Sequence, residues 1–412
     1  MQTVNTEIAI IGAGVIGLAI AVRLIADGHE VVMLDPEMPG SGASYGNAAT
    51  IADYAIMPVG SPQVLRNLPS LLLDRNSPLA IRKAAILSLA PWLARFALQS
   101  LPDPTEHNTR ALAAIVMDAG ERWNDLATHL DAQDLLQKRG YLQFFKDSSA
   151  WRAAQGDYFA RRDRFGIAVE PVDAATLATM EPGLAAYEGG LFFPTAMHLS
   201  DPGQMTARMA ASVRATSQIL STHAERIERV AGGVRVTGPN IEIRARHVVI
   251  AAGAYSRALA RSAGDRVPLE TERGYHLEWE GEEGRLSRPC CPPWYGFYMT
   301  PLAGRLRAAG TVELGGLRAG PSRHRLDRIL AGAREVFPDL GPPTREWLGF
   351  RPSMPDSLPV VGASRLGPEV IHAYGHGHVG LTLAPVTAEM VAGLIGGTLP
   401  HPGMAALSPT RF

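Results

Sequence analysis

The stretch that decides the fold is Glu7-Ile-Ala-Ile-Ile-Gly-Ala-Gly-Val-Ile-Gly17, close to the start of the chain. Its apolar, β-branched opening over 7–11 predicts a short buried strand of a parallel sheet. Three glycines spaced as G-x-G-x-x-G follow, and a helix is expected over 18–26. A second apolar run over 31–34, which ends at Asp35, predicts a neighbouring strand. Together these segments predict one compact βαβ unit.

This βαβ unit has the features of a dinucleotide-binding site. Gly12 permits the tight turn, Gly14 lets the backbone approach a pyrophosphate, and Gly17 lets helix and strand pack closely. The start of the helix offers free N–H groups and the positive end of its dipole to phosphates. Asp35 stands where a carboxylate accepts hydrogen bonds from ribose hydroxyls, and no arginine follows it to bind a 2′-phosphate. The alternative is a glycine-rich turn in some other α/β protein.

Two further glycine-rich loops extend this pattern. The loop over 40–49 is rich in glycine and serine, and Ser41 or Ser44 can reach phosphate oxygens. The loop over 375–380 leads into a helix expected over 381–395, with Pro385 in its first turn. The start of that helix can stabilise the negative charge of a reduced flavin. Either loop can also be an ordinary turn.

The remaining segments predict the fold class. Buried parallel strands are expected over 247–253 and 370–374, and antiparallel strands over 271–279 and 296–301. Asp201-Pro202 predicts the capped start of a helix that runs to about residue 215, and one amphipathic helix is expected over 111–130. The fold class is therefore α/β: a discontinuous nucleotide domain interleaved with a second domain built on an antiparallel sheet.

Composition excludes several classes of protein. Of 412 residues, 46% are hydrophobic and 19% charged, which indicates a folded protein. Lys+Arg is 39 against an Asp+Glu of 40, so nucleic acid is not an expected partner. The two cysteines, Cys290 and Cys291, are adjacent and cannot form a disulfide framework. No secretory signal or membrane span is recognised, so a cytoplasmic protein is expected.

One apolar stretch, 84–98, follows Arg82 and Lys83 and contains a single charged residue, Arg95. It suggests a peripheral contact with the inner face of a membrane, near a quinone pool. The alternative is a helix that covers the second domain.

At this point the chain resembles the D-amino-acid oxidase superfamily of FAD-dependent oxidoreductases, and within it the bacterial D-amino-acid dehydrogenases, including D-hydroxyproline dehydrogenases. The resemblance rests on segments in family order along the whole chain: 10–17, 44–48, 248–254, 349–352 with 355–362, and 375–385. It implies a Rossmann-like FAD-binding domain that carries both termini, formed by 1–60, 201–262 and 350–412. It assigns 61–200 and 263–349 to a substrate domain built on a mostly antiparallel sheet.

The resemblance also implies which residues bind FAD. Ala224 occupies the position of a backbone contact to adenine, in a strand before Arg226. Because no cysteine lies in 351–356, FAD is expected to bind non-covalently. The expected cofactor-binding residues are Gly12, Gly14, Val15, Ile16, Gly17, Asp35, Pro36, Ser44, Asn47, Ala48, Ala224, Ala252, Gly253, Gly377, His378, Val379, Gly380, Leu381 and Thr382.

Arg351 matches the arginine that binds the substrate carboxylate in the amino-acid-oxidising members, and a guanidinium fork suits that anion. Tyr275 and His276 are adjacent on an expected strand, so only one of them can face the site, and His276 is preferred. Tyr298 is a further candidate for binding the carboxylate. His276, Tyr298 and His378 are the catalytic candidates, because a neutral imidazole helps to generate a free amine. A surface histidine and a core tyrosine are the structural alternatives for His276 and Tyr298.

The implied reaction is transfer of a hydride from Cα of a D-amino acid to flavin N5, with a cyclic substrate such as D-hydroxyproline or D-proline preferred. The electron acceptor is expected to be a quinone or an electron-transfer protein. No lysine follows Lys146, whereas sarcosine-oxidase relatives use a lysine above the flavin to promote reaction with oxygen, and this favours a dehydrogenase. An oxygen-using glycine or sarcosine oxidase and a flavoprotein subunit of a hetero-oligomer remain alternatives, and an NAD-dependent dehydrogenase is a more distant one.

Overall fold

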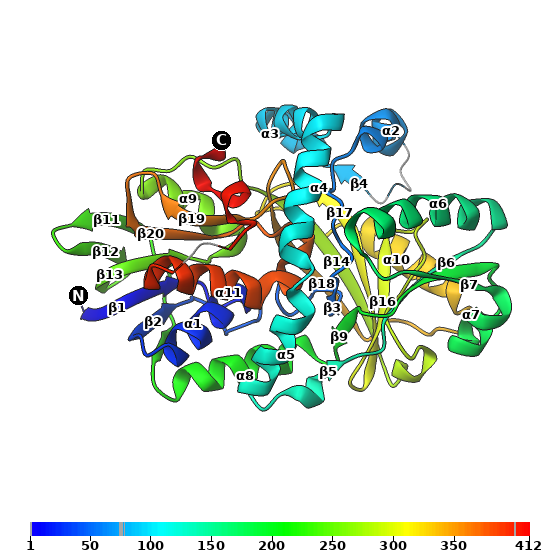
Figure 1. Ribbon diagram of the computed structural model, residues 1–412, viewed down its shortest axis with the longest axis horizontal. Helices are drawn as coiled ribbons and strands as arrows, with labels where there is room; N and C mark the ends of the chain where they lie inside the picture. Colours follow the sequence, from blue (N-terminus) through cyan, green and yellow to red (C-terminus); the bar gives the residue numbers. More distant parts are fainter. Residues whose placement is uncertain (1, 74–76, 78, 399–400) are drawn as a thin grey trace.

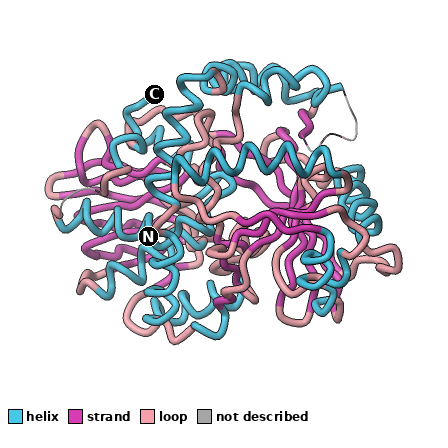
Figure 2. Tube along the Cα trace, turned by 45° about the vertical axis from the view of Figure 1, so that its right-hand side comes forward, coloured by secondary structure: helices cyan, strands magenta, loops and turns pink. Residues whose placement is uncertain are grey.

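The computed structural model of the protein describes residues 2–73, 77, 79–398 and 401–412. Two large sheets lie at opposite ends of the molecule, with the long helix α4 (Pro102–Val116) running between them (Figure 1). The tube view shows the same separation of strands into two groups, each flanked by helices (Figure 2). The architecture thus combines α/β and α+β parts, as the sequence predicts.

The first sheet has parallel strands at its centre, in the order β10-β2-β1-β13, with β20 beside β13. The hairpin β11–β12 and strand β19 add antiparallel pairs. The strands of this sheet are β1 (Gln2–Ile11), β2 (Val31–Leu34), β10 (Gln218–Leu220), β11 (Arg226–Val230), β12 (Gly233–Gly238), β13 (Ile241–Ile250), β19 (Val360–Ser364) and β20 (Gly367–Tyr374).

Apolar helices cover the first sheet. The helix of the opening motif, α1 (Val15–Ala26), packs against α11 (Gly380–Gly396) and α8 (Pro202–Arg214). Asp201 caps α8 by accepting hydrogen bonds from the N–H groups of residues 203 and 204, as its sequence predicts. The single helix expected over 111–130 is wrong: the chain leaves regular helical bonding at 117–118 and divides into α4 and α5 (Ala119–His129), and α5 packs on α11.

The second sheet is mostly antiparallel, in the order β18-β14-β17-β16-β15-β6-β8-β7, with β4 beside β17. Alternate residues of β14 place Tyr275 against α10 (Arg323–Val336), in the apolar cluster on one face. The other face is turned toward the first domain. The strands are β4 (Leu79–Ile81), β6 (Tyr141–Phe145), β7 (Glu170–Asp173), β8 (Gly189–Phe193), β14 (Glu270–Glu280), β15 (Cys290–Cys291), β16 (Phe297–Leu302), β17 (Arg305–Leu314) and β18 (Arg345–Ser353).

The remaining elements connect and cover these two sheets. Strand β18 crosses the predicted domain boundary at 349–350 and pairs with β14 over 270–278; the predicted domain limits themselves stay a prediction. The connecting elements are β3 (Thr50–Ile51), β5 (Leu136–Gln137), β9 (Met197–Leu199), α2 (Pro62–Leu73), α3 (Ile86–Gln99), α6 (Ser148–Phe165), α7 (Ala174–Met180) and α9 (Ser256–Ser262).

One helix in the described part of the chain, Gly377–Gly396, is long and apolar enough to cross a membrane, but 67% of its most apolar window is buried in the core. The bent pair Lys83–Gln99 and Pro102–His129 passes the same test only when taken together, across an 86° bend. Within it, α3 exposes Leu87 and Leu98 to solvent and buries Leu89 and Trp92.

Candidate active site

The glycine motif forms the close-packed turn that its spacing predicts. Gly12 has φ +108°, and a Cβ on it would lie 2.4 Å from the carbonyl oxygen of Ala251, the residue that follows β13. A Cβ on Gly17 would lie 2.0 Å from the carbonyl oxygen of Gly12. A Cβ on Gly14 would meet open space except for the Ser44 hydroxyl oxygen, 3.1 Å away. Helix α1 begins directly after Gly14, and no side chain caps its start. An uncapped helix start beside open space fits a bound pyrophosphate.

Asp35 and Ser44 take part in this turn. The Asp35 carboxylate accepts hydrogen bonds from the N–H groups of Ala13 (2.6 Å) and Glu37 (2.9 Å) and keeps lone pairs for a ribose hydroxyl. The Ser44 hydroxyl oxygen accepts from the Val15 N–H at 2.8 Å, which leaves its own proton free to donate. Both side chains therefore shape the cofactor site and can still contact a ligand.

The loop over 40–49 is held in shape by its own asparagine. The Asn47 amide donates to the Ser44 carbonyl oxygen (2.7 Å) and accepts from the Ala49 N–H (2.7 Å). Ala49 has φ +60°, a conformation that this local bonding stabilises. The second sheet then fixes the loop, because the Thr300 hydroxyl donates to the Ala48 carbonyl oxygen at 2.8 Å.

A buried arginine, which the sequence analysis missed, is the main anchor of this loop. Arg307 is fully buried, and its guanidinium donates to the carbonyl oxygens of Tyr45 (2.7 Å) and Asn47 (2.8 Å). It also forms two hydrogen bonds to one carboxylate oxygen of Glu278, at 2.6 and 2.8 Å. In a chain rich in arginine, nothing in the sequence around Arg307 distinguished it from a surface residue.

His276 lies within this anchor. Its ring is fully buried, stacks on Trp347 at 4.9 Å, and has Nδ1 3.2 Å from the Gly46 carbonyl oxygen. Burial, with the nearby charge of Arg307, lowers the pKa of His276 to about 3. A ring that stays neutral at neutral pH supports a role in holding the loop, and its position does not favour the predicted role in proton transfer.

Arg351 extends across the face of the second sheet that is turned toward the first domain. A Cβ on Gly274 would lie 2.3 Å from Nη1 of Arg351, so the missing side chain on β14 makes room for the guanidinium. Nη1 donates to the carbonyl oxygen of Thr311 on β17 at 3.1 Å. Pairing between β14 and β17 shifts by one residue here, and Thr311 adopts φ +58°, a strained conformation for a β-branched residue. Such bulges re-aim groups beside active sites.

The Arg351 side chain keeps most of its donors free. In the described part of the chain, no carboxylate lies within 4 Å of it, and the Thr311 carbonyl is its one hydrogen-bond acceptor. Burial lowers the pKa of Arg351, and the charge of Glu272 offsets part of that effect. A half-buried guanidinium with unused donors is a site for an anion.

Glu272 and His378 form a contact beside this arginine. Glu272 faces Arg351 in the register of β14 and β18, and its Oε2 lies 2.6 Å from Nε2 of His378. Glu272 is buried, whereas 39% of the His378 side chain is exposed. Glu272 belongs to the strand expected over 271–279, but nothing in its sequence context distinguished it from a surface carboxylate.

Tyrosines form the wall on the other side of Thr311. Tyr298 pairs with Ala309, two residues before Thr311, and its ring stacks on Tyr141 at 5.1 Å. The Tyr54 ring stacks on Tyr141 at 4.9 Å, and its hydroxyl lies 3.4 Å from that of Tyr298. Burial raises the pKa of the Tyr298 phenol, which therefore stays a neutral hydrogen-bonding group. The position of Tyr298 favours a substrate contact.

Tyr275 lies on the opposite face of the sheet. Its hydroxyl donates to Glu313 at 2.5 Å, and its ring packs in the cluster with α10. That position does not favour the predicted contact with substrate. Ala224 lies in the loop between β10 and β11, so its expected placement in a strand is wrong. Gly253 follows β13 with open space around it, next to Ala252, and Pro36 follows Asp35 at the end of β2.

The last predicted loop leads into α11. The helix begins at Gly380, after a single 3₁₀ turn (Gly377–Val379), so Pro385 lies in its second turn and not in its first. Proline has no N–H to bond with the Leu381 carbonyl oxygen, and the Trp123 indole donates to that oxygen at 3.0 Å instead. The Thr382 hydroxyl accepts from the Ala52 N–H at 3.0 Å, which ties the helix start to the loop after β3.

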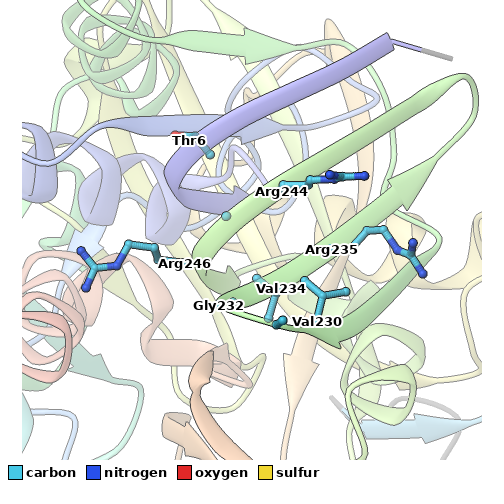
Figure 3. Close-up of a pocket in the computed structure, with 10 residues that line it drawn as sticks. Thr6, Val230, Gly232, Val234, Arg235, Arg244 and Arg246 are labelled. Carbon is cyan, nitrogen blue, oxygen red and sulfur yellow. The ribbon is translucent and has the colours of Figure 1, made fainter.

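A separate pocket of about 470 Å³ lies on the hairpin β11–β12 and the neighbouring part of β13, away from these residues (Figure 3). Its three arginines are each engaged: Arg235 with Glu228 at 2.6 Å, Arg244 with Glu242 at 2.8 Å, and Arg246 with Glu7 at 4.0 Å. This surface therefore offers no free cation, in contrast to Arg351.

Curated relatives match nearly the whole length of this chain. The chain is 33% identical over 423 residues to a D-amino-acid oxidase of Bradyrhizobium diazoefficiens, with 98% of this chain and 99% of the relative covered. It is 30% identical to a D-amino acid dehydrogenase of a Methylobacterium species, with 97% of each covered.

Solved structures share the fold. A glycine oxidase from Geobacillus kaustophilus superimposes with a TM-score of 0.79 at 22% identity, over all of both chains. An L-proline dehydrogenase from P. horikoshii gives a TM-score of 0.74 at 19% identity, over 100% of this chain and 98% of that one. The family model described as FAD dependent oxidoreductase matches residues 7–394. The chain therefore belongs to this family of FAD-dependent oxidoreductases.

Proposed function

We propose that the protein oxidises a D-amino acid at its Cα–N bond, with a non-covalently bound FAD as the immediate oxidant. The single observation that carries this proposal is Arg351, a half-buried guanidinium with unused donors on the face of the second sheet that is turned toward the first domain. The curated relatives that match nearly the whole chain support a D-amino acid as the substrate class.

FAD supplies a two-electron acceptor for the Cα hydride. The residues that would hold it are the start of α1 with Gly14, the Asp35 carboxylate, the Ser44 hydroxyl and the loop that Arg307 anchors. The start of α11 would place its positive dipole end toward the charge that develops on reduction.

The protein's own part in the reaction is mainly orientation. Arg351 binds the substrate carboxylate with two parallel hydrogen bonds, and Tyr298 donates a further one. The stacked rings of Tyr54 and Tyr141 exclude water from the side-chain pocket. Fixing the carboxylate and the side chain aims the Cα–H bond, a positioning effect that lowers the barrier without a strong base.

For the finer specificity we propose a cyclic substrate such as D-proline or D-hydroxyproline. The aromatic cluster of Tyr54, Tyr141, Tyr298 and Phe193 offers flat apolar surfaces to a small ring, together with the neighbouring hydroxyl groups of Tyr54 and Tyr298. This surface suits an apolar or hydroxylated ring better than a charged side chain.

For the electron acceptor we propose a quinone or an electron-transfer protein. The exposed leucines of α3, with Arg95 on the same helix, would bring the protein to an anionic membrane surface where quinone is dissolved. An oxygen-using oxidase is the main competing activity, because one curated relative carries the name of an oxidase.

The test is a visible spectrum of the purified protein, followed under anaerobic conditions while D- and L-amino acids are added one at a time. We expect a flavin spectrum that one or more D-amino acids bleach, most rapidly a D-proline, and that L-amino acids leave unchanged. Reoxidation is then timed with air, and separately with a soluble quinone. Rapid reoxidation by air with release of peroxide would replace the dehydrogenase with an oxidase.

A flavin spectrum that no amino acid bleaches would overturn the proposed reaction. Adding a candidate partner protein at that point tests the alternative of a flavoprotein subunit, which gains activity only in a hetero-oligomer.

A further inference from the structure

Glu272 is a buried carboxylate that lies between two basic groups. In the register of the second sheet it faces Arg351, and its Oε2 contacts Nε2 of His378 at 2.6 Å. Although burial by itself raises its pKa, the hydrogen bond from His378 and the positive charge of Arg351 hold the pKa of Glu272 below its ordinary value. The carboxylate therefore stays ionised, and the buried position needs both neighbours.

The other charged groups near His378 are already engaged. His376, in the same loop, is buried and bonded through Nε2 to the Thr387 hydroxyl at 2.9 Å, and burial lowers its pKa to about 3. Helix α11 carries one charged residue, Glu389, which lies in the middle of the helix and pairs with Arg122 at 3.1 Å. In the part of the chain that the structure describes, Glu272 is the charged group in contact with the His378 ring, and Arg351 faces Glu272 across the strand pair.

The contact with Glu272 selects one arrangement of that ring. Nε2 must carry a proton to donate to the carboxylate, so Nδ1 of a neutral ring is the atom with a free lone pair. In the described part of the chain, Nδ1 of His378 has no protein partner. A free lone pair beside the arginine expected to bind a carboxylate is placed to meet the amino group of the same amino acid.

We infer that Glu272 is a positioning residue, which fixes His378 so that Nδ1 accepts a proton from the substrate ammonium group. This inference rests on the proposed function. In the step, one N–H bond of the ammonium breaks, its electron pair stays on the substrate nitrogen, and an Nδ1–H bond forms. No electron leaves the substrate in this step; the hydride transfer that follows is the oxidation.

The step moves one positive charge and leaves the sum of charges in the site unchanged. The substrate enters with a negative carboxylate, which Arg351 binds, and a positive ammonium group. When the proton passes to Nδ1, the positive charge lies on the His378 ring, where the Glu272 carboxylate in contact with Nε2 stabilises it.

The test measures the rate of anaerobic flavin reduction against pH in Glu272→Gln. We expect at least about a tenfold loss at pH 7, because the amide has no charge to stabilise a protonated His378. The loss should disappear toward pH 10, where the substrate amine is already free. Glu270→Gln is the matched control, since Glu270 lies on the same strand and pairs with Arg257. A loss of the same size at every pH would contradict the inference and indicate a structural role only.

A second readout does not depend on turnover. The protein is labelled with ¹⁵N in its histidines, and the NMR signals of His378 are identified by their absence from the spectrum of His378→Gln. We expect the wild-type holoenzyme to show the tautomer of His378 that carries its proton on Nε2. Glu272→Leu should abolish that preference. A mixture of tautomers in the wild type would overturn the inference. If no amino acid reduces the flavin, the proposed function fails, while this measurement still decides whether Glu272 fixes the ring.

Discussion

The absence of a side chain at Gly274 is what allows Arg351 to extend across the sheet. Arg351 starts on β18 and reaches the Thr311 carbonyl on β17, with β14 between them. At Gly274, a Cβ would lie within 2.6 Å of three guanidinium atoms. The glycine is therefore part of the anion site although it carries no functional group.

We predict that Gly274→Ala displaces the guanidinium and raises the dissociation constant for a D-amino acid by at least about tenfold, roughly the loss of one charge-assisted hydrogen bond. Flavin content should not change. The measurement is anaerobic titration of the flavin spectrum. Gly284→Ala is the matched control, because a Cβ there meets no atom within 4 Å. Equal affinity in the two variants would show that Gly274 does not set the position of Arg351.

At the scale of elements, the helix next to the predicted flavin position contains a proline that its neighbour compensates. Pro385 leaves the Leu381 carbonyl oxygen of α11 without its helical donor, and Trp123 of α5 supplies an indole N–H. This bond explains why α5 must pack on α11. It also fixes the first turn of a helix whose residues Leu381 and Thr382 are expected to face the flavin.

Trp123→Phe should lower the free energy of unfolding by about 1–3 kcal/mol, since a buried carbonyl loses its partner as well as some packing. The control is Trp92→Phe: Trp92 is also buried, but its indole nitrogen has no hydrogen-bond partner in the described part of the chain. Urea unfolding of the holoenzyme measures both. If both substitutions lower the free energy of unfolding by the same amount, the hydrogen bond from Trp123 to α11 makes no specific contribution to stability.

At the scale of the whole molecule, three buried histidines make folding sensitive to acid. Burial lowers the pKa of His276 and His376 to about 3 and that of His198 to about 4. Below about pH 6.5 the unfolded chain binds protons that the folded chain excludes, so the free energy of unfolding falls as the pH falls.

Between about pH 7.5 and 5.5 we predict a loss of about 1.4 kcal/mol for each of these histidines. Urea unfolding at the two pH values measures the summed loss of unfolding free energy. His198→Gln should reduce this loss by about a third. His223→Gln is the control, because that side chain is 55% exposed. A pH dependence that His198→Gln leaves unchanged would contradict this account.

The sequence by itself determined the elements whose signals are local. The first strand, the glycine turn with its helix, and the Asp201 cap all follow from short-range rules of spacing, capping and backbone freedom. The motifs and their order along the chain were enough to identify the family. Each motif could be recognised because its backbone geometry depends on its own local sequence.

Only the tertiary structure decided which side chains act together. Gly274, Glu272 and Arg351 lie up to 79 residues apart in the sequence, and they meet because β14 and β18 pair in one register. The same register turned Tyr275 toward the core and buried His276 as a neutral ring. Burial and electrostatic interaction depend on distances in space. The charge states of the groups at this site could therefore not be predicted from the order of the residues in the sequence.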